Sequence, residues 1–197
     1  MEIAAVQNRY VTRRFSENRY RLGMYVALAA VLMLFTALTS AYIVRSASSN
    51  DWQSLAMPRI LLLSTMLILV SSATLEAARR KLKAALGRAY ISWLSVTVIL
   101  GLGFLVTQLL AWRQLTRQGV YLASSPHSSF FYLLTATHGV HLFGGLLALG
   151  YLLIQNWQQF TDELITRRQV VADAVTVYWH FMDALWIYLF LLLFLWK

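Results

Sequence analysis

The sequence predicts an all-α membrane protein in which five transmembrane helices form a bundle, with the N-terminus in the cytoplasm and the C-terminus outside. Three observations predict this fold class: long apolar blocks, few charges within them, and an uneven distribution of basic residues between them. Of the 197 residues, 59% are hydrophobic and 13% are charged. A soluble domain carries about 25% charged residues, so the composition favours a membrane protein.

Five apolar blocks each reach the roughly 20 residues that an α-helix needs to cross the hydrocarbon core of a bilayer. Their only formal charges are Arg59, near one end of the second block, and Asp183 in the fifth. The first block is too long to be the apolar core of a cleaved signal peptide. We therefore expect a cytoplasmic arm over residues 1–21 and a membrane domain over residues 22–197. Its spans are predicted at residues 22–44, 55–75, 89–112, 130–154 and 174–196.

The basic residues predict the orientation of these spans. Of the 17 lysines and arginines, five flank one set of span ends, namely Arg45, Arg59, Arg113, Arg117 and Lys197. The remaining 12 precede the first span or lie between spans two and three or four and five. Cytoplasmic loops carry the excess of basic residues, so the N-terminus is expected inside. Because the net charge of +9 gathers at span ends, it does not indicate nucleic-acid binding.

Ionisable side chains at membrane depth are costly and mark candidate functional sites. Here they are His138 and His141 in the fourth span and His180 and Asp183 in the fifth, with Asp173 at the inner edge of the fifth. From the rise per residue, His141 lies roughly 16 Å below the outer boundary and Asp183 roughly 14 Å above the inner one. Because the two residues share a level, we expect them to pair and to form a polar seam between these spans.

Three interpretations of this seam remain open. The favoured one is a hydrogen-bonded clamp that ties the fourth span to the fifth. The second is a proton relay or a lipid-headgroup site. The third is haem ligation, which is disfavoured because His138 and His180 differ in depth by several ångström. The chain has no cysteine and only one acid beside the histidines, so neither a metal site nor a cofactor is expected within it.

Smaller side chains suggest how the helices pack. Ser71 and Ser72 are expected to form hydrogen bonds with their own helix or a neighbour. The aromatic segment 186–196 is expected to face lipid and the membrane interface. Four glycines of the fourth span are expected at close helix contacts, namely Gly139, Gly144, Gly145 and Gly150.

Two motifs resemble those of a known family. Residues 135–145 read T-A-T-H-G-V-H-L-F-G-G, and residues 173–186 read D-A-V-T-V-Y-W-H-F-M-D-A-L-W. Shorter matches follow in the same order, with R-L-G-M at residues 21–24 and F-L-V-T-Q at residues 104–108. With these residues the chain resembles subunit III of the haem–copper respiratory oxidases, in the short bacterial form with five helices.

The resemblance implies a subunit of cytochrome c oxidase, a proton-translocating oxidoreductase complex, in the bacterial plasma membrane. Such a subunit has no reaction centre, because haem and copper belong to the partner subunits I and II. It packs on subunit I, binds phospholipid, supports proton uptake and protects the oxidase from inactivation during turnover. Arg21, at the cytoplasmic end of the first span, is the candidate for a contact with a lipid phosphate.

The chain departs from the family pattern at two positions. Val31 stands where family members usually have a buried glutamate, and Ala111 stands where they often have an acid. Any proton-handling role of those carboxylates is therefore not expected here. Close alternatives are subunit III of a quinol oxidase and an accessory subunit of nitric oxide reductase. More remote ones are a di-haem membrane cytochrome and a small transporter, the latter disfavoured because inverted repeats and broken helices are lacking.

Overall fold

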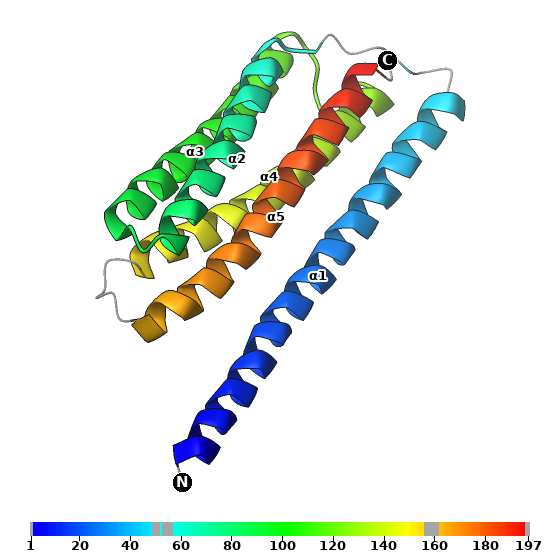
Figure 1. Ribbon diagram of the computed structural model, residues 1–197. Coiled ribbons are helices and arrows are strands. Elements are labelled where there is room, and N and C mark those ends of the chain that lie inside the picture. The colour runs from blue at the N-terminus through cyan, green and yellow to red at the C-terminus, as the bar shows by residue number, and fades with distance from the viewer. Residues whose placement is uncertain (1, 49–51, 53–56, 156–161, 196–197) are drawn as a thin grey trace.

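The computed structural model describes residues 2–48, 52, 57–155 and 162–195, with no side chains described for residues 2–21 and 162–168. This part of the chain consists of five helices and contains no strand (Figure 1). All five are long and apolar enough to span a membrane, which confirms the predicted all-α fold with five membrane-spanning helices, while the orientation of the termini stays a prediction. They are α1 (Glu2–Ser48), α2 (Ile60–Lys83), α3 (Gly87–Arg117), α4 (Pro126–Gln155) and α5 (Asp162–Leu195).

Helix α5 is central to the arrangement, because it contacts α1, α2 and α4. Helix α2 pairs with α3 on one side of it, and α1 lies on the other side (Figure 1). Helix α4 contacts α3, α5 and α1 and so connects the two sides. Consecutive helices run in opposite directions, so α1 begins and α5 ends at opposite ends of the bundle (Figure 1). We call the end that holds the α2–α3 turn the inner end, because the sequence predicts that it is cytoplasmic.

The first two helices start at residues other than those predicted for their spans. The arm over residues 1–21 continues into the first span as one helix from Glu2, because no proline interrupts it and its single glycine, Gly23, does not break the helix. The second helix begins at Ile60 instead of residue 55, and residues 55 and 56 lie outside the described part. Pro58 and Arg59 form the turn before it, where their carbonyls accept hydrogen bonds from the amides of Leu61 and Leu62.

The other helices extend past the predicted spans into the polar segments. Helix α2 continues to Lys83, and the chain then reverses at Ala85, whose φ is +56°. Helix α3 continues to Arg117, and α5 already begins at Asp162. Hydropathy marks only the part of a helix that lies in hydrocarbon, so it underestimates helices that continue into the headgroup region.

Large aromatic side chains fill the interior. Trp186 is 1% exposed, so the expectation that the aromatic segment faces lipid is wrong at this residue. Its indole packs edge-on against Phe104, with ring centroids 4.9 Å apart, and donates a hydrogen bond to Thr65. Tyr188 and Phe194 farther along α5 are each 46% exposed and so lie at the surface of the chain.

Glycines allow α3 and α4 to approach the Trp179 ring closely. A Cβ atom on Gly145 would lie 3.3 Å from Trp179, which confirms the predicted close contact. A Cβ atom on Gly101 would lie 2.8 Å from both Trp179 and Leu146, so this glycine, which residue spacing did not single out, has the tighter contact. The other three glycines of α4 do not lie at the close contacts that were expected, namely Gly139, Gly144 and Gly150. Among the described atoms, an added Cβ atom would meet only an ordinary van der Waals contact or open space at these positions.

Candidate functional site

Polar side chains line the contact between α2 and α5 from its inner end to its middle. Residues three or four apart on a helix share one face, and both helices place polar residues at such intervals. We call this set the α2–α5 seam, formed by Thr65, Ser71, Ser72, Glu76, Arg79, Lys83, Asp173, Trp179, His180, Asp183 and Trp186.

A charged cluster forms the inner end of the seam. Arg79 donates a hydrogen bond from Nε to Oδ1 of Asp173 at 2.6 Å and another from Nη1 to Oε2 of Glu76 at 3.1 Å. Lys83 Nζ lies 3.8 Å from the same oxygen of Asp173. The Arg79 and Asp173 side chains are about one-third exposed, so an ion pair here stabilises the fold by only about 0–1 kcal/mol.

Hydroxyl groups of α2 bind aromatic rings of α5 deeper in the seam. Trp179 donates to Ser71 at 3.0 Å, and Ser71 in turn donates to the carbonyl of Ile68. The hydroxyl of Ser72 and Nδ1 of His180 are hydrogen-bonded at 2.6 Å. These contacts confirm the predicted bonding of both serines, to their own helix and to a neighbouring one.

Asp183 is the most unusual group of the seam. Its side chain is 5% exposed, and Oδ2 lies 3.9 Å from Nδ1 of His180, too far for a hydrogen bond. Ser72 lies beside the carboxyl group, yet neither carboxyl oxygen has a hydrogen-bond partner of good geometry among the described residues. A polar group buried without a partner is rare and costly, so this carboxyl group calls for a specific explanation.

The predicted pairing of His141 with Asp183 is wrong. His141 Nδ1 is hydrogen-bonded to the carbonyl of Thr137 at 2.8 Å, and its ring packs edge-on against Phe35 of α1 at 5.8 Å. Asp183 instead faces α2, beside Ser72. Equal depth fixes the position of a residue along its helix but not the direction of its side chain around the helix axis, and here the two directions diverge.

His138 is fully buried and ties α4 to α5. Its Nε2 is hydrogen-bonded to the backbone carbonyl of Met182 at 3.2 Å. The ring lies 5.0 Å from that of Trp186 and 5.7 Å from that of Phe104. This geometry fits the predicted clamp, although its acceptor is a carbonyl that no side-chain pattern reveals. The five predicted polar residues thus divide, with Asp173, His180 and Asp183 in the seam and the histidines of α4 apart from it.

The two positions that lack the family's acids are buried among apolar groups. Val31 in α1 is 7% exposed and Ala111 in α3 is fully buried, and both belong to the hydrophobic core. Sequence reasoning also missed Gln108, which donates to Ser64 at 3.1 Å. The signal available in the sequence was a glutamine within an otherwise apolar block. The side chain of Arg21 lies outside the described residues.

A second missed group lies at the outer end of the bundle. The His127 ring stacks on Trp52, with centroids 4.9 Å apart, and its Nε2 lies 3.4 Å from the hydroxyl of the buried Tyr42. These contacts connect the end of α1 to the start of α4. His127 was missed because it precedes the predicted fourth span and so gave no signal of membrane depth.

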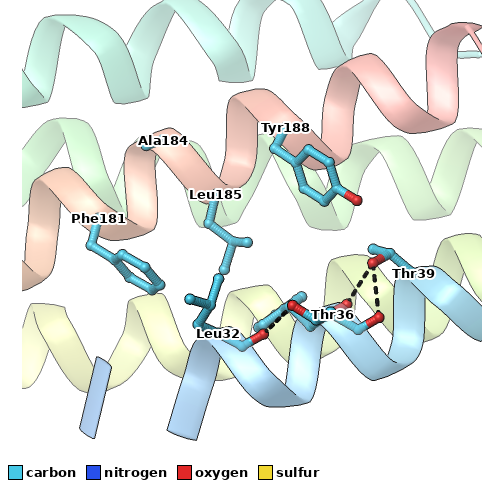
Figure 2. A pocket seen from close by; sticks show the side chains of 8 residues that line it. Leu32, Thr36, Thr39, Phe181, Ala184, Leu185 and Tyr188 are labelled. Carbon is cyan, nitrogen blue, oxygen red and sulfur yellow. Dashed lines mark hydrogen bonds between the residues drawn. The ribbon is translucent and has the colours of Figure 1, made fainter. Parts of the chain in front are cut away.

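Two grooves open on the surface of the bundle. One lies between α1 and α5, where Leu32, Phe181 and Leu185 point into the space between the helices (Figure 2). It encloses about 270 Å³, and its Thr36 and Thr39 hydroxyls donate to carbonyls of their own helix. This groove is therefore apolar and suits a hydrocarbon chain.

The second groove, also about 270 Å³, lies at the inner end of the seam. Arg79, Asp173 and His180 line it together with Met24 and Tyr25 of α1. It therefore connects the charged cluster to the His180 side chain, which is 40% exposed. In the part of the chain that the structure describes, no three His, Asp or Glu side chains come together as a metal site requires.

Comparison with known proteins shows which family the chain is similar to. The family model described as cytochrome c oxidase subunit III matches residues 11–197. Cytochrome c oxidase subunit 3 of Bacillus subtilis is 31% identical over 184 residues, covering 91% of this chain and 86% of that protein. The subunit of the same name from Bacillus sp. strain PS3 is 30% identical with the same coverage. Quinol oxidase subunit 3 of Bacillus subtilis is 27% identical over 172 residues, covering 86% of this chain and 83% of that protein.

Proposed function

The chain belongs to the cytochrome c oxidase subunit III family, and from this premise we propose that it is the non-catalytic subunit III of a bacterial cytochrome c oxidase. The family match over residues 11–197 carries this proposal. In the proposed complex, haem and copper reside in subunits I and II, and this chain contacts subunit I. The complex lies in the bacterial plasma membrane, with the N-terminus of this chain in the cytoplasm, as the basic residues predict.

The first proposed role is to stabilise subunit I. Cross-helix hydrogen bonds support it, since His138 ties α4 to α5 and Trp179 and Trp186 tie α5 to α2. Such bonds fix helices against one another where no water competes for the polar groups. Large apolar side chains cover the outer faces of the bundle, among them Ile99 and Val140. These faces are suited to both a membrane partner and lipid.

The second proposed role is to hold phospholipid. The apolar groove between α1 and α5 supports it (Figure 2), because its volume and lining suit part of an acyl chain. Arg21 remains the candidate for the phosphate contact, since it precedes the span that forms one wall of this groove. An arginine binds a phosphate through two parallel hydrogen bonds.

The third proposed role is to support proton uptake by the oxidase. The charged cluster at the inner end of the seam supports it, because Glu76, Arg79, Lys83 and Asp173 together present both acids and bases. This cluster opens to the surface through the inner groove. Such a role cannot use carboxylates at positions 31 and 111, where this chain has Val31 and Ala111.

Removal of the subunit from the purified complex tests these roles. We expect the depleted oxidase to consume oxygen at first and then to lose activity over successive turnovers faster than the intact complex. Restoring the chain with phospholipid should restore the working life. Activity that is absent from the first turnover, with haem and copper content intact, would contradict a supporting role.

A quinol oxidase is the second candidate for the complex, because a quinol oxidase subunit 3 is 27% identical over 86% of this chain. The two candidates differ in the electron donor, which binds to other subunits. Oxygen consumption by the purified complex with reduced cytochrome c and with a quinol decides between them. Turnover with cytochrome c supports the first candidate, and turnover with quinol alone replaces it by the second.

A further inference from the structure

We propose that Asp183, together with Ser72 and His180, forms a proton-binding site within the membrane that exchanges protons with the inner side through the groove beside Arg79 and Asp173. This inference deepens the proton-uptake role, and its meaning for the oxidase rests on that proposed function. The site itself is a property of this chain and is tested separately.

The isolation of the Asp183 carboxyl group carries the proposal. Its side chain is 95% buried within this chain, and neither oxygen accepts a hydrogen bond of good geometry from the described residues. An ionised carboxylate in such a place is costly, whereas a bound proton removes the charge. The chain's own helices leave only 5% of this side chain exposed, which leaves little of it open to direct contact with lipid or another chain.

His180 connects this carboxyl group to the surface. Its side chain is 40% exposed and lines the inner groove, while its Nδ1 lies 2.6 Å from the Ser72 hydroxyl. The 3.9 Å between Nδ1 and Oδ2 of Asp183 excludes a direct hydrogen bond. Since Ser72 lies beside the carboxyl group as well, a small movement of its hydroxyl completes the path.

The transfer is balanced in protons and charge. Protonated His180 gives the proton on Nδ1 to the oxygen of Ser72, while the hydroxyl proton of Ser72 passes to the Asp183 carboxylate. The products are a neutral imidazole, an unchanged hydroxyl group and a neutral carboxylic acid. The neutral ring of His180 then rotates so that Nδ1, which has lost its proton, faces the groove and takes up another one, and the reverse sequence releases the stored proton.

Charged and titratable groups surround this path on each helix that lines it. Helix α2 contributes Glu76, Arg79 and Lys83, and α5 contributes Asp173. Helix α1 contributes Tyr25 to the groove, whereas α3 and α4 add no described residue to its lining. The histidines of α4, His138 and His141, point to Met182 and Phe35 instead. The acids of the cluster are thus placed to collect protons, and Arg79 and Lys83 balance their charge.

The site ends at Asp183 and does not cross the membrane. The next seam contact toward the outer end is the hydrogen bond from the Trp186 indole to Thr65 at 3.1 Å. An indole N–H donates but has no lone pair with which to accept a proton. The geometry therefore describes a proton store that fills and empties from the inner side.

Infrared difference spectroscopy of the intact complex tests this site. A band of a protonated carboxyl group in the wild type should disappear in Asp183→Asn and persist in Asp173→Asn, the matched control from the ion-paired cluster. In His180→Phe the band should remain, but its shift after transfer to heavy water should slow by roughly 100-fold, as expected when a positioned proton carrier is lost. A band that persists in Asp183→Asn, or an unchanged exchange rate in His180→Phe, would overturn the proposal.

A labelling experiment on the wild-type chain does not depend on whether any variant folds. A lipid-soluble carbodiimide reacts with protonated carboxyl groups, so peptide mass spectrometry should find the label on Asp183 and not on Asp173. Label on Asp173 alone would overturn the site. If the chain purified without haem–copper partners, the proposed function would fail, while the label on Asp183 would still decide whether the proton site exists.

Discussion

Gly101 lies where α3 crosses the Trp179 ring of α5, and alanine at this position should destabilise the bundle. The added Cβ atom would lie 2.8 Å from Trp179 Cη2 and 2.8 Å from Leu146 Cδ2. Real Cβ atoms do not approach other heavy atoms this closely, so one neighbour must move. Leu146 can change its rotamer, but the Trp179 ring is fully buried and held by its hydrogen bond to Ser71.

The expected cost combines two opposing effects. Inserting a methyl group into a packed core costs about 1–3 kcal/mol, while replacing glycine by alanine inside a helix gains about 0.5–1 kcal/mol. The two ranges combine to a net loss of about 0–2.5 kcal/mol, and we expect about 1–2 kcal/mol for Gly101→Ala because two separate atoms would lie at 2.8 Å. Gly103→Ala is the matched control, because it lies on the same helix and its Cβ atom would meet only Leu67 at 3.6 Å.

The assay is thermal unfolding of the chain within the purified complex, in the same detergent and lipid for each variant. Gly101→Ala should lower the unfolding temperature, and Gly103→Ala should leave it unchanged or raise it. Leu146→Ala should itself destabilise the bundle by about 2–5 kcal/mol, but in a double-mutant cycle the added cost of Gly101→Ala should be smaller in the Leu146→Ala background, since one of the two close contacts is then absent. Equal stability of the two glycine variants would refute the close approach of α3 to Trp179.

Three further results are expected. His141→Leu and Asp183→Leu should have additive effects on stability, within about 0.3–0.5 kcal/mol in a double-mutant cycle, because the two side chains face different helices; a larger coupling would show that they touch. Trp179→Phe should lower the free energy of unfolding by about 0.5–1.5 kcal/mol, because the hydrogen bond to Ser71 is lost. Trp93→Phe, at a 41% exposed position, should lower it less. The reverse order would contradict a stabilising role for the Trp179–Ser71 bond. The separated chain should give a flat reduced-minus-oxidised spectrum, and a stoichiometric haem band would exclude the proposed division of cofactors.

Hydropathy was sufficient to predict the five helices, because a bilayer requires each span to be a long apolar helix. The uneven distribution of basic residues predicted a cytoplasmic N-terminus. This orientation stays a prediction. The helix ends were less predictable, since residues such as Arg117 and Asp162 continue a helix outside the hydrocarbon, where composition no longer distinguishes helix from loop.

Sequence reasoning identified only part of the candidate site and did not identify how its members pair. Asp173, His180 and Asp183 lie in the α2–α5 seam, whereas the two histidines of α4 do not. The cost of polar groups in lipid singled out His138, His180 and Asp183 as residues that need partners. Their actual partners depend on the rotation of each helix about its axis, which sequence spacing within one helix does not determine. The acceptor for His138 is a backbone carbonyl, at Met182, and every residue carries one, so the sequence offered no signal for this choice.

Co-purification of the tagged chain is the most direct test of whether it is a subunit of a haem–copper oxidase. Membranes of the native organism are solubilised in mild detergent, the chain is captured by its tag, and the eluate is examined by absorption spectroscopy and mass spectrometry. We expect stoichiometric haem and copper, carried by partner chains of an oxygen-reducing oxidase. Recovery of the folded chain from these membranes without any haem-containing partner would contradict it.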